Sequence, residues 1–239
     1  MTRHWKYTWL LISIIALLIL NPLIDHERIF ELMYTLMLAC VFGGLILILF
    51  HRPKSRLIAL ILGVPTMIST FTFTLFPTLP PSLGSLIFHL LPAGFLGYAV
   101  VVLLRSIFRN PGISTDSING AFCGYLLLGL TFGHLYCLIE MYRPGSFNLE
   151  DYVGGLPDGE RRRHALLSYF SLVTLTTVGY GDIVPRHGTA RSVACIEAVI
   201  GQFYVGVVVA ELLALKVSTV LNNRFRQEDS HHRQGERGA

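Results

Sequence analysis

The sequence predicts an all-α membrane protein with six transmembrane helices and one shorter helix that re-enters the membrane. Hydrophobic residues make up 52% of the 239 residues and charged residues only 14%, whereas a soluble domain has about 25% charged residues. The mean hydropathy is +0.56. The apolar residues also gather in long uninterrupted runs. Their number exceeds what one compact soluble core and its polar shell require.

Five of these runs approach or exceed the roughly 20 apolar residues that a bilayer-spanning helix needs. They are residues 5–24, 29–50, 57–76, 86–104 and 118–140. A sixth run, residues 189–216, carries Glu197 and Glu211. Residues 166–178 lie between the fifth and sixth runs, and are too few to span the bilayer but enough to re-enter it. No small-x-small cleavage site follows the first run before Asp25, so we expect a retained helix rather than a signal peptide.

The charges predict the orientation and the class of partner. With a cytoplasmic N-terminus, the inner segments hold 12 of the 19 basic residues, in agreement with the positive-inside rule. We therefore expect a multi-pass protein of the cell (inner) membrane with both termini in the cytoplasm and membrane lipids around it. The net charge of +4 does not indicate nucleic acid as a partner, because the basic residues are scattered and form no dense patch.

Residues 174–182 read Thr-Leu-Thr-Thr-Val-Gly-Tyr-Gly-Asp, preceded by a short apolar helix and followed by a long one. In this the sequence resembles the potassium channel family, in its prokaryotic type with a two-helix pore and a TVGYG selectivity filter, here with four extra N-terminal helices. The resemblance covers residues 118–216. It implies that one chain supplies a single filter loop, so that a closed ring needs four chains and the protein is a homotetramer.

The resemblance assigns the ion-binding filter to Thr177, Val178, Gly179, Tyr180 and Gly181. The backbone carbonyls of the first four would bind K⁺, the permeant ion, with the Thr177 hydroxyl as the innermost ligand; no other metal and no cofactor is expected. Successive carbonyls can point one way only with alternating unusual backbone angles, which Gly179 and Gly181 permit. Val178 and Tyr180 would turn their side chains outward. The alternative is a tight glycine turn that merely links two helices.

Several residues around the filter are expected to support it. The short helix, residues 163–175, would point the negative end of its dipole at a cation in mid-membrane. Tyr169 and Phe170 stand where the family often has aromatic side chains that brace the filter, and Thr176 and Asp182 flank it. Some bacterial channels pair the aspartate with a glutamate, but Val173 occupies that position, so Asp182 needs another partner.

Three residues of the sixth run are functional candidates. Gly201 stands where many family members have the glycine that bends the inner helix, and Gly206 offers a second hinge; close helix packing is the alternative. Glu197 lies about 12 Å below the outer end of the helix at 1.5 Å per residue, at the depth of the filter. Intramembrane acids are functional candidates. Glu197 either braces a hydroxyl such as that of Ser171 or Thr174, or senses protons.

The breaker sequence Asn110–Pro111–Gly112 divides the chain. We predict a four-helix transmembrane domain over residues 1–110, a pore domain over 111–216, and a short polar cytoplasmic tail over 217–239 that frays. The fourth run, residues 86–104, has no Lys or Arg, so the first domain is not a voltage sensor. Its role is either to bind a lipid or small ligand or to shield the pore. His89 and His134 lie within the spans without metal-ligand spacing and are expected to form ordinary hydrogen bonds.

The predicted function is a potassium-selective ion channel, which is not an enzyme. Two alternatives remain. The chain could be a regulatory subunit that conducts only in a mixed tetramer, because its filter would be intact in both cases. It could also be a membrane transporter or enzyme that reuses a helix hairpin, although only Glu197 lies deep in a span and no nucleophile or metal triad is evident from the sequence.

Overall fold

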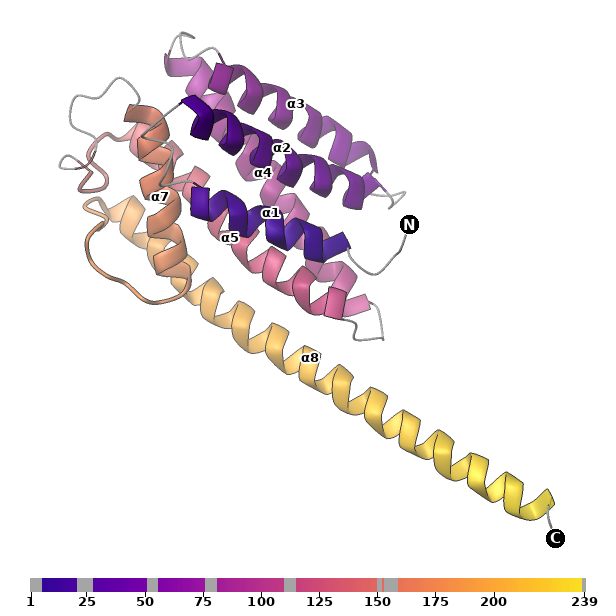
Figure 1. Cartoon of the computed structure of the whole chain (residues 1–239). Coiled ribbons are helices and arrows are strands. Elements are labelled where there is room, and N and C mark those ends of the chain that lie inside the picture. Colours follow the sequence, from indigo (N-terminus) through magenta and orange to yellow (C-terminus); the bar gives the residue numbers. More distant parts are fainter. Residues whose placement is uncertain are drawn as a thin grey trace.

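The structure, a computed structural model, describes residues 6–20, 28–50, 56–75, 81–109, 115–149, 152 and 159–237. Over these residues the fold is built from helices, with one isolated β-bridge between Phe147 and Pro185. The helices are α1 (Lys6–Leu20), α2 (Arg28–Phe50), α3 (Arg56–Leu75), α4 (Pro81–Arg109), α5 (Thr115–Tyr142), α7 (Gly159–Leu175) and α8 (Gly188–Arg237). Figure 1 shows α1 to α5 side by side in a bundle, with α7 between this bundle and α8.

Among the residues that the structure describes, three helices contain a stretch that is long and apolar enough to cross a membrane. These stretches are Gly84–Ser106 of α4, Asp116–Tyr142 of α5 and Gly188–Val208 of α8. Shorter apolar stretches occupy Lys6–Ile19, Leu36–Leu49 and Arg56–Thr72 of the first three helices. The all-helical fold class agrees with the prediction, whereas six membrane spans remain a prediction for α1 to α3.

Helix α5 lies at the centre of the molecule and packs against α1, α4, α7 and α8. One hydrophobic core joins Ile14 of α1, Leu45 of α2, Phe95 of α4 and Leu127 of α5, all of them fully buried or nearly so. This core extends across the predicted border between the first domain and the pore domain. The border residues themselves, 110–114, lie outside the described residues.

The glycines of α5 allow α7 and α8 to approach it closely. A Cβ on Gly124 would lie 2.6 Å from the Tyr204 hydroxyl of α8, and one on Gly133 would lie 2.9 Å from the Cα of Ser168 on α7. A Cβ on Gly129 would lie 2.6 Å from a side-chain carbon of Leu172 on α7. Small residues permit backbones to come into contact in this way, so the glycines of α5 set its distance from both α7 and α8.

Helices α1 and α5 begin on the same side of the bundle. The Asp116 carboxylate at the start of α5 accepts a hydrogen bond of 3.0 Å from the backbone N–H of Tyr7 at the start of α1. That N–H has no partner within its own helix, since the first turn of a helix leaves its donors free. Asn119 adds a hydrogen bond of 2.8 Å to the Thr8 hydroxyl.

Helix α8 corrects the prediction of a fraying tail. It continues without a break from Gly188 to Arg237, over 50 residues, which corresponds to about 75 Å at 1.5 Å per residue. A bilayer core is only about 30 Å thick, and the later half of α8 projects well beyond the other helices (Figure 1). The residues after Lys216 contain Leu, Arg, Gln and Glu but no proline, and these residue types favour helix even in a polar sequence.

Candidate functional site

The loop predicted to form the filter begins where α7 ends. Helix α7 stops at Leu175, the predicted residue, although it begins four residues earlier than expected. The backbone N–H of Thr176 donates to the Leu172 carbonyl at 3.0 Å, and its hydroxyl donates to the same oxygen at 2.7 Å. Thr176 therefore satisfies a carbonyl of the last turn, which would otherwise lack a partner.

The backbone of the next residues alternates between two conformations. Thr177, Gly179 and Gly181 have positive φ angles of 59°, 57° and 78°, whereas Val178 and Tyr180 between them do not. Glycine adopts positive φ at little cost, but a β-branched residue does so only under constraint. Thr177 is held by a hydrogen bond of 2.9 Å from its N–H to the Thr174 carbonyl. The sequence predicted positive φ at the two glycines and missed it at Thr177.

The predicted filter residues are all exposed in the single chain. The side chain of Val178 is 53% exposed and that of Tyr180 is 71% exposed. The sequence predicts that both side chains turn outward into surrounding protein. The residues that the structure describes leave both of them largely uncovered. Both side chains therefore lie open on the surface of the single chain.

Asp182 after the filter has its partner on α7. The Tyr169 hydroxyl donates a hydrogen bond of 2.8 Å to the Asp182 carboxylate, and this bond lowers the pKa of that carboxyl below its ordinary value. The structure thus brings together two residues that were named separately as filter support. Tyr169 is the other partner that Asp182 requires in the absence of a glutamate at position 173.

Asn148 fastens the far end of the loop, and no feature of the sequence predicted this role. Its side-chain N–H donates to the Asp182 carbonyl at 3.0 Å, and its side-chain oxygen accepts from the Val184 N–H at 2.5 Å. The backbone N–H of Arg186 also donates to the Ser146 carbonyl at 2.7 Å. The segment after α5 therefore holds in place the segment that leads from the predicted filter loop to α8.

Phe170, the next residue of α7, lies in an aromatic cluster away from the loop. Its ring packs edge-on against Tyr136 of α5 and Phe147, with centroids 5.1 Å and 5.2 Å apart, and only 6% of the side chain is exposed. Edge-to-face aromatic packing of this kind is geometrically specific. Phe170 thus fixes α7 against α5, while Tyr169 reaches the loop.

Glu197 is fully buried and contacts two hydroxyl groups. One carboxyl oxygen accepts a hydrogen bond from the Tyr136 hydroxyl of α5, and the other is within hydrogen-bonding distance of the Ser171 hydroxyl of α7. Ser171 was one of the two braces considered from the sequence; Tyr136, 61 positions away, was not. Glu197 therefore joins α8 to both α5 and α7.

Gly201 packs against the end of α7. A Cβ at this position would overlap the Leu175 carbonyl oxygen, which accepts a hydrogen bond of 2.8 Å from the Tyr125 hydroxyl of α5. By contrast, a Cβ at Gly206 meets nothing within 4 Å. The two hinge candidates therefore have different surroundings: Gly201 is a close-approach position and Gly206 is open.

One side-chain contact joins α8 to the predicted filter loop. The Gln202 side-chain N–H donates to the Thr177 hydroxyl at 3.1 Å, the group that was expected to be the innermost ion ligand. Gln202 follows Gly201, so the close packing of that glycine brings the amide within reach. Polar character in an otherwise apolar run was the one sequence signal that could have identified Gln202.

Comparison with known proteins finds similarity over part of the chain. Residues 165–216, from α7 through the filter loop into α8, match the family model described as "Ion channel". The chain is 43% identical over 44 residues to the two pore potassium channel a of Oryza sativa subsp. japonica, covering 18% of this chain and 13% of that protein. It is 38% identical over 65 residues to the two-pore potassium channel 1 of Arabidopsis thaliana, covering 26% and 18%.

The matched stretch thus spans less than a fifth of each of these relatives. No solved structure matches the chain. The family model and the relatives support a potassium channel and point away from an enzyme, and together with the apolar helices they suggest a membrane protein.

Proposed function

We propose that the chain is one subunit of a homotetrameric, potassium-selective channel. The observation that carries this proposal is the alternation of backbone angles over Thr177, Gly179 and Gly181, at the end of a short helix and beside a long one. Alternating conformations turn successive carbonyls to one side, where they can replace the hydration shell of an ion. A tight linking turn would not need positive φ at three alternate residues.

The exposed face of α8 supports assembly. Only 17% of its membrane-spanning window is buried within the chain, compared with 61% for α5. Glu197, Gly201, Tyr204 and Val208 pack on α5 and α7. The face left open carries Ile196, Val199, Ile200, Phe203 and Val207. This face and the open Val178 and Tyr180 side chains are what three further copies would cover.

In this assembly K⁺ is the permeant ion and the protein needs no other cofactor. The carbonyls of Thr177, Val178, Gly179 and Tyr180 would bind it, and the C-terminal end of α7 would favour a cation in the cavity below. The chain would lie in the cell (inner) membrane among its lipids with both termini in the cytoplasm, in accord with α1 and α5 beginning on the same side.

The test is to reconstitute the purified protein alone in planar bilayers under a potassium gradient. The reversal potential should follow the potassium gradient and should not respond to sodium. Tyr180→Asp should weaken this preference because the aromatic side chain that anchors the loop is lost. His187→Gln, at an exposed position outside the filter, is the matched control and should behave as the parent does.

Two outcomes oppose the proposal in different ways. Equal permeability to sodium and potassium in the parent protein would refute the filter assignment. A protein that forms tetramers, measured by native mass spectrometry, but carries no current alone would identify a regulatory subunit instead.

A further inference from the structure

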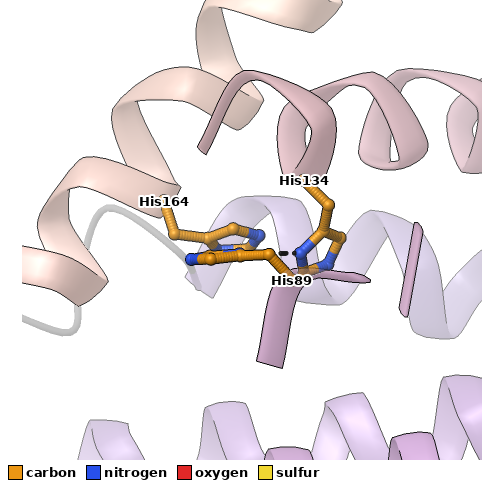
Figure 2. Close-up of side chains that lie close together, drawn as sticks. All are labelled: His89, His134 and His164. Carbon is orange, nitrogen blue, oxygen red and sulfur yellow. Dashed lines mark hydrogen bonds between the residues drawn. The ribbon is translucent and has the colours of Figure 1, made fainter. Parts of the chain in front are cut away.

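Three histidines from three helices meet on the side of α7 that faces the first four helices. They are His89 of α4, His134 of α5 and His164 of α7, and one ring nitrogen from each lies within 4.8 Å of the other two. Figure 2 shows the three rings converging, with a hydrogen bond of 3.1 Å between the Nδ1 atoms of His89 and His134. The sequence predicts no metal-ligand spacing for His89 and His134, because the three histidines are 45 and 30 residues apart.

The cluster is largely shielded from solvent. His89 and His134 are 2% and 6% exposed, and His164 stacks on His89 with ring centroids 5.6 Å apart and an interplanar angle of 29°. His134 and His164 are closer still, at 4.4 Å between centroids. Rings this close repel one another if all are protonated, and the neutral imidazole is the form that binds a metal ion.

The distances are close to those of a metal site. Zn–N bonds of about 2.0–2.1 Å in tetrahedral geometry place neighbouring ligand nitrogens about 3.3 Å apart. The Nδ1 atoms of His89 and His134 are 3.1 Å apart, so this pair already has the spacing of two ligands. The third nitrogen, on His164, lies within 4.8 Å and needs only a modest side-chain movement to complete the set.

The backbone around the cluster holds the ligands at this separation. Gly133, next to His134, allows α5 to approach Ser168 of α7, where a Cβ would lie 2.9 Å from the Ser168 Cα. The Ser168 hydroxyl is 3.5 Å from the Nε2 of His164. An outer-shell hydroxyl can orient a ligand ring and so fix which nitrogen faces the metal.

We propose that His89, His134 and His164 bind one divalent transition-metal ion between α4, α5 and α7, with Zn²⁺ as the best match. Imidazole suits Zn²⁺, Cu²⁺ and Ni²⁺, whereas Ca²⁺ and Mg²⁺ prefer oxygen ligands. Three histidines leave a fourth coordination position for water or another small ligand. A bound ion would fasten the first four helices to α7, the helix that ends at the filter, and so give the front half of the chain a defined link to the pore.

The experiment is isothermal titration of the purified full chain with Zn²⁺, in a parent in which the tail histidines are changed (His231→Gln and His232→Gln). We expect one Zn²⁺ per chain and a higher midpoint of thermal unfolding on binding. His89→Gln and His164→Gln should each weaken binding by at least about 100-fold, since even loss of an outer-shell partner costs 10- to 100-fold. His187→Gln, an exposed histidine outside the cluster, should bind as the parent does.

Co²⁺ provides a second readout that does not depend on removing a ligand. The parent should show the intense visible absorption of four-coordinate Co²⁺, and His89→Cys should retain binding and add a sulfur-to-cobalt charge-transfer band. The absence of stoichiometric binding in the parent would overturn the proposal. So would full affinity in a variant that combines His89→Gln, His134→Gln and His164→Gln. Both readouts are independent of ion conduction, so failure here leaves the proposed channel function untouched.

Discussion

At the scale of single residues, the hydrogen count around Glu197 indicates its charge state. The Ser171 hydroxyl contacts both Glu197 and the Gly129 carbonyl, the latter at 2.7 Å, yet it has only one hydrogen. Both contacts are hydrogen bonds if Ser171 donates to Gly129 and a protonated Glu197 donates to Ser171. The second Glu197 oxygen then accepts from Tyr136. A neutral acid also avoids placing an unpaired charge at membrane depth.

Glu197→Gln is therefore expected to be nearly silent, because the amide reproduces one donor and one acceptor. Glu197→Ala should destabilise the protein by about 1–3 kcal/mol per buried hydroxyl left without a partner. The measurement is the thermal stability of the purified assembly, together with its potassium selectivity. Currents that depend on pH in the parent but lose this dependence in Glu197→Gln would show instead that Glu197 titrates and senses protons.

Tyr169→Phe should make the filter more sensitive to external acid. The hydrogen bond from Tyr169 lowers the pKa of Asp182, so the bond contributes stability above the ordinary pKa of an aspartate and is lost as pH falls through the lowered pKa. Without the hydroxyl, Asp182 accepts a proton at higher pH. The pH midpoint of current loss should shift upward in Tyr169→Phe. An unchanged or lower midpoint would show that this pair does not maintain the conducting filter.

At the scale of elements, Gly201→Ala and Gly206→Ala should differ in kind. An alanine at 201 would overlap the Leu175 carbonyl, so it should push α8 from α7 and lower both thermal stability and potassium selectivity. An alanine at 206 has room and should stabilise a straight α8 by up to about 1 kcal/mol, lowering open probability if α8 bends there. Single-channel recording and thermal unfolding check both. An unchanged open probability in Gly206→Ala would remove the hinge candidate that remains.

The elements near the filter were predictable where the information is local. The end of α7 at Leu175 and positive φ at Gly179 and Gly181 follow from a short apolar run and a glycine-rich motif. Tyr136, Asn148 and His164 were missed because each has its partner on another element, dozens of residues away. Pairings of this kind depend on how helices pack, which a single sequence does not reveal. The helical tail was missed because polarity was given more weight than helix propensity.

At the scale of the whole molecule, the four N-terminal helices share an apolar core with α5, and residues 86–104 of α4 contain no Lys or Arg. The apolar core that joins α1, α2 and α4 to α5 is built from Leu, Ile and Phe side chains. A voltage sensor instead needs basic side chains within the membrane that can move through its field. In α4, the basic residues Arg105 and Arg109 lie only at its C-terminal end. The prediction that the first four helices do not form a voltage sensor rests on this distribution of charge.

Open probability should consequently depend only weakly on voltage. One elementary charge that crosses 100 mV contributes about 2.3 kcal/mol, and residues 86–104 of α4 contain no Lys or Arg to contribute it. The measurement is open probability of the reconstituted parent from strongly negative to strongly positive potentials in symmetrical potassium. Val101→Arg adds one basic residue to α4 at a lipid- or partner-facing position that is 44% exposed. This variant provides a comparison with a known added charge. A parent curve as steep as several gating charges per subunit would mean that charged groups outside residues 86–104 move with the gate, and would contradict this prediction.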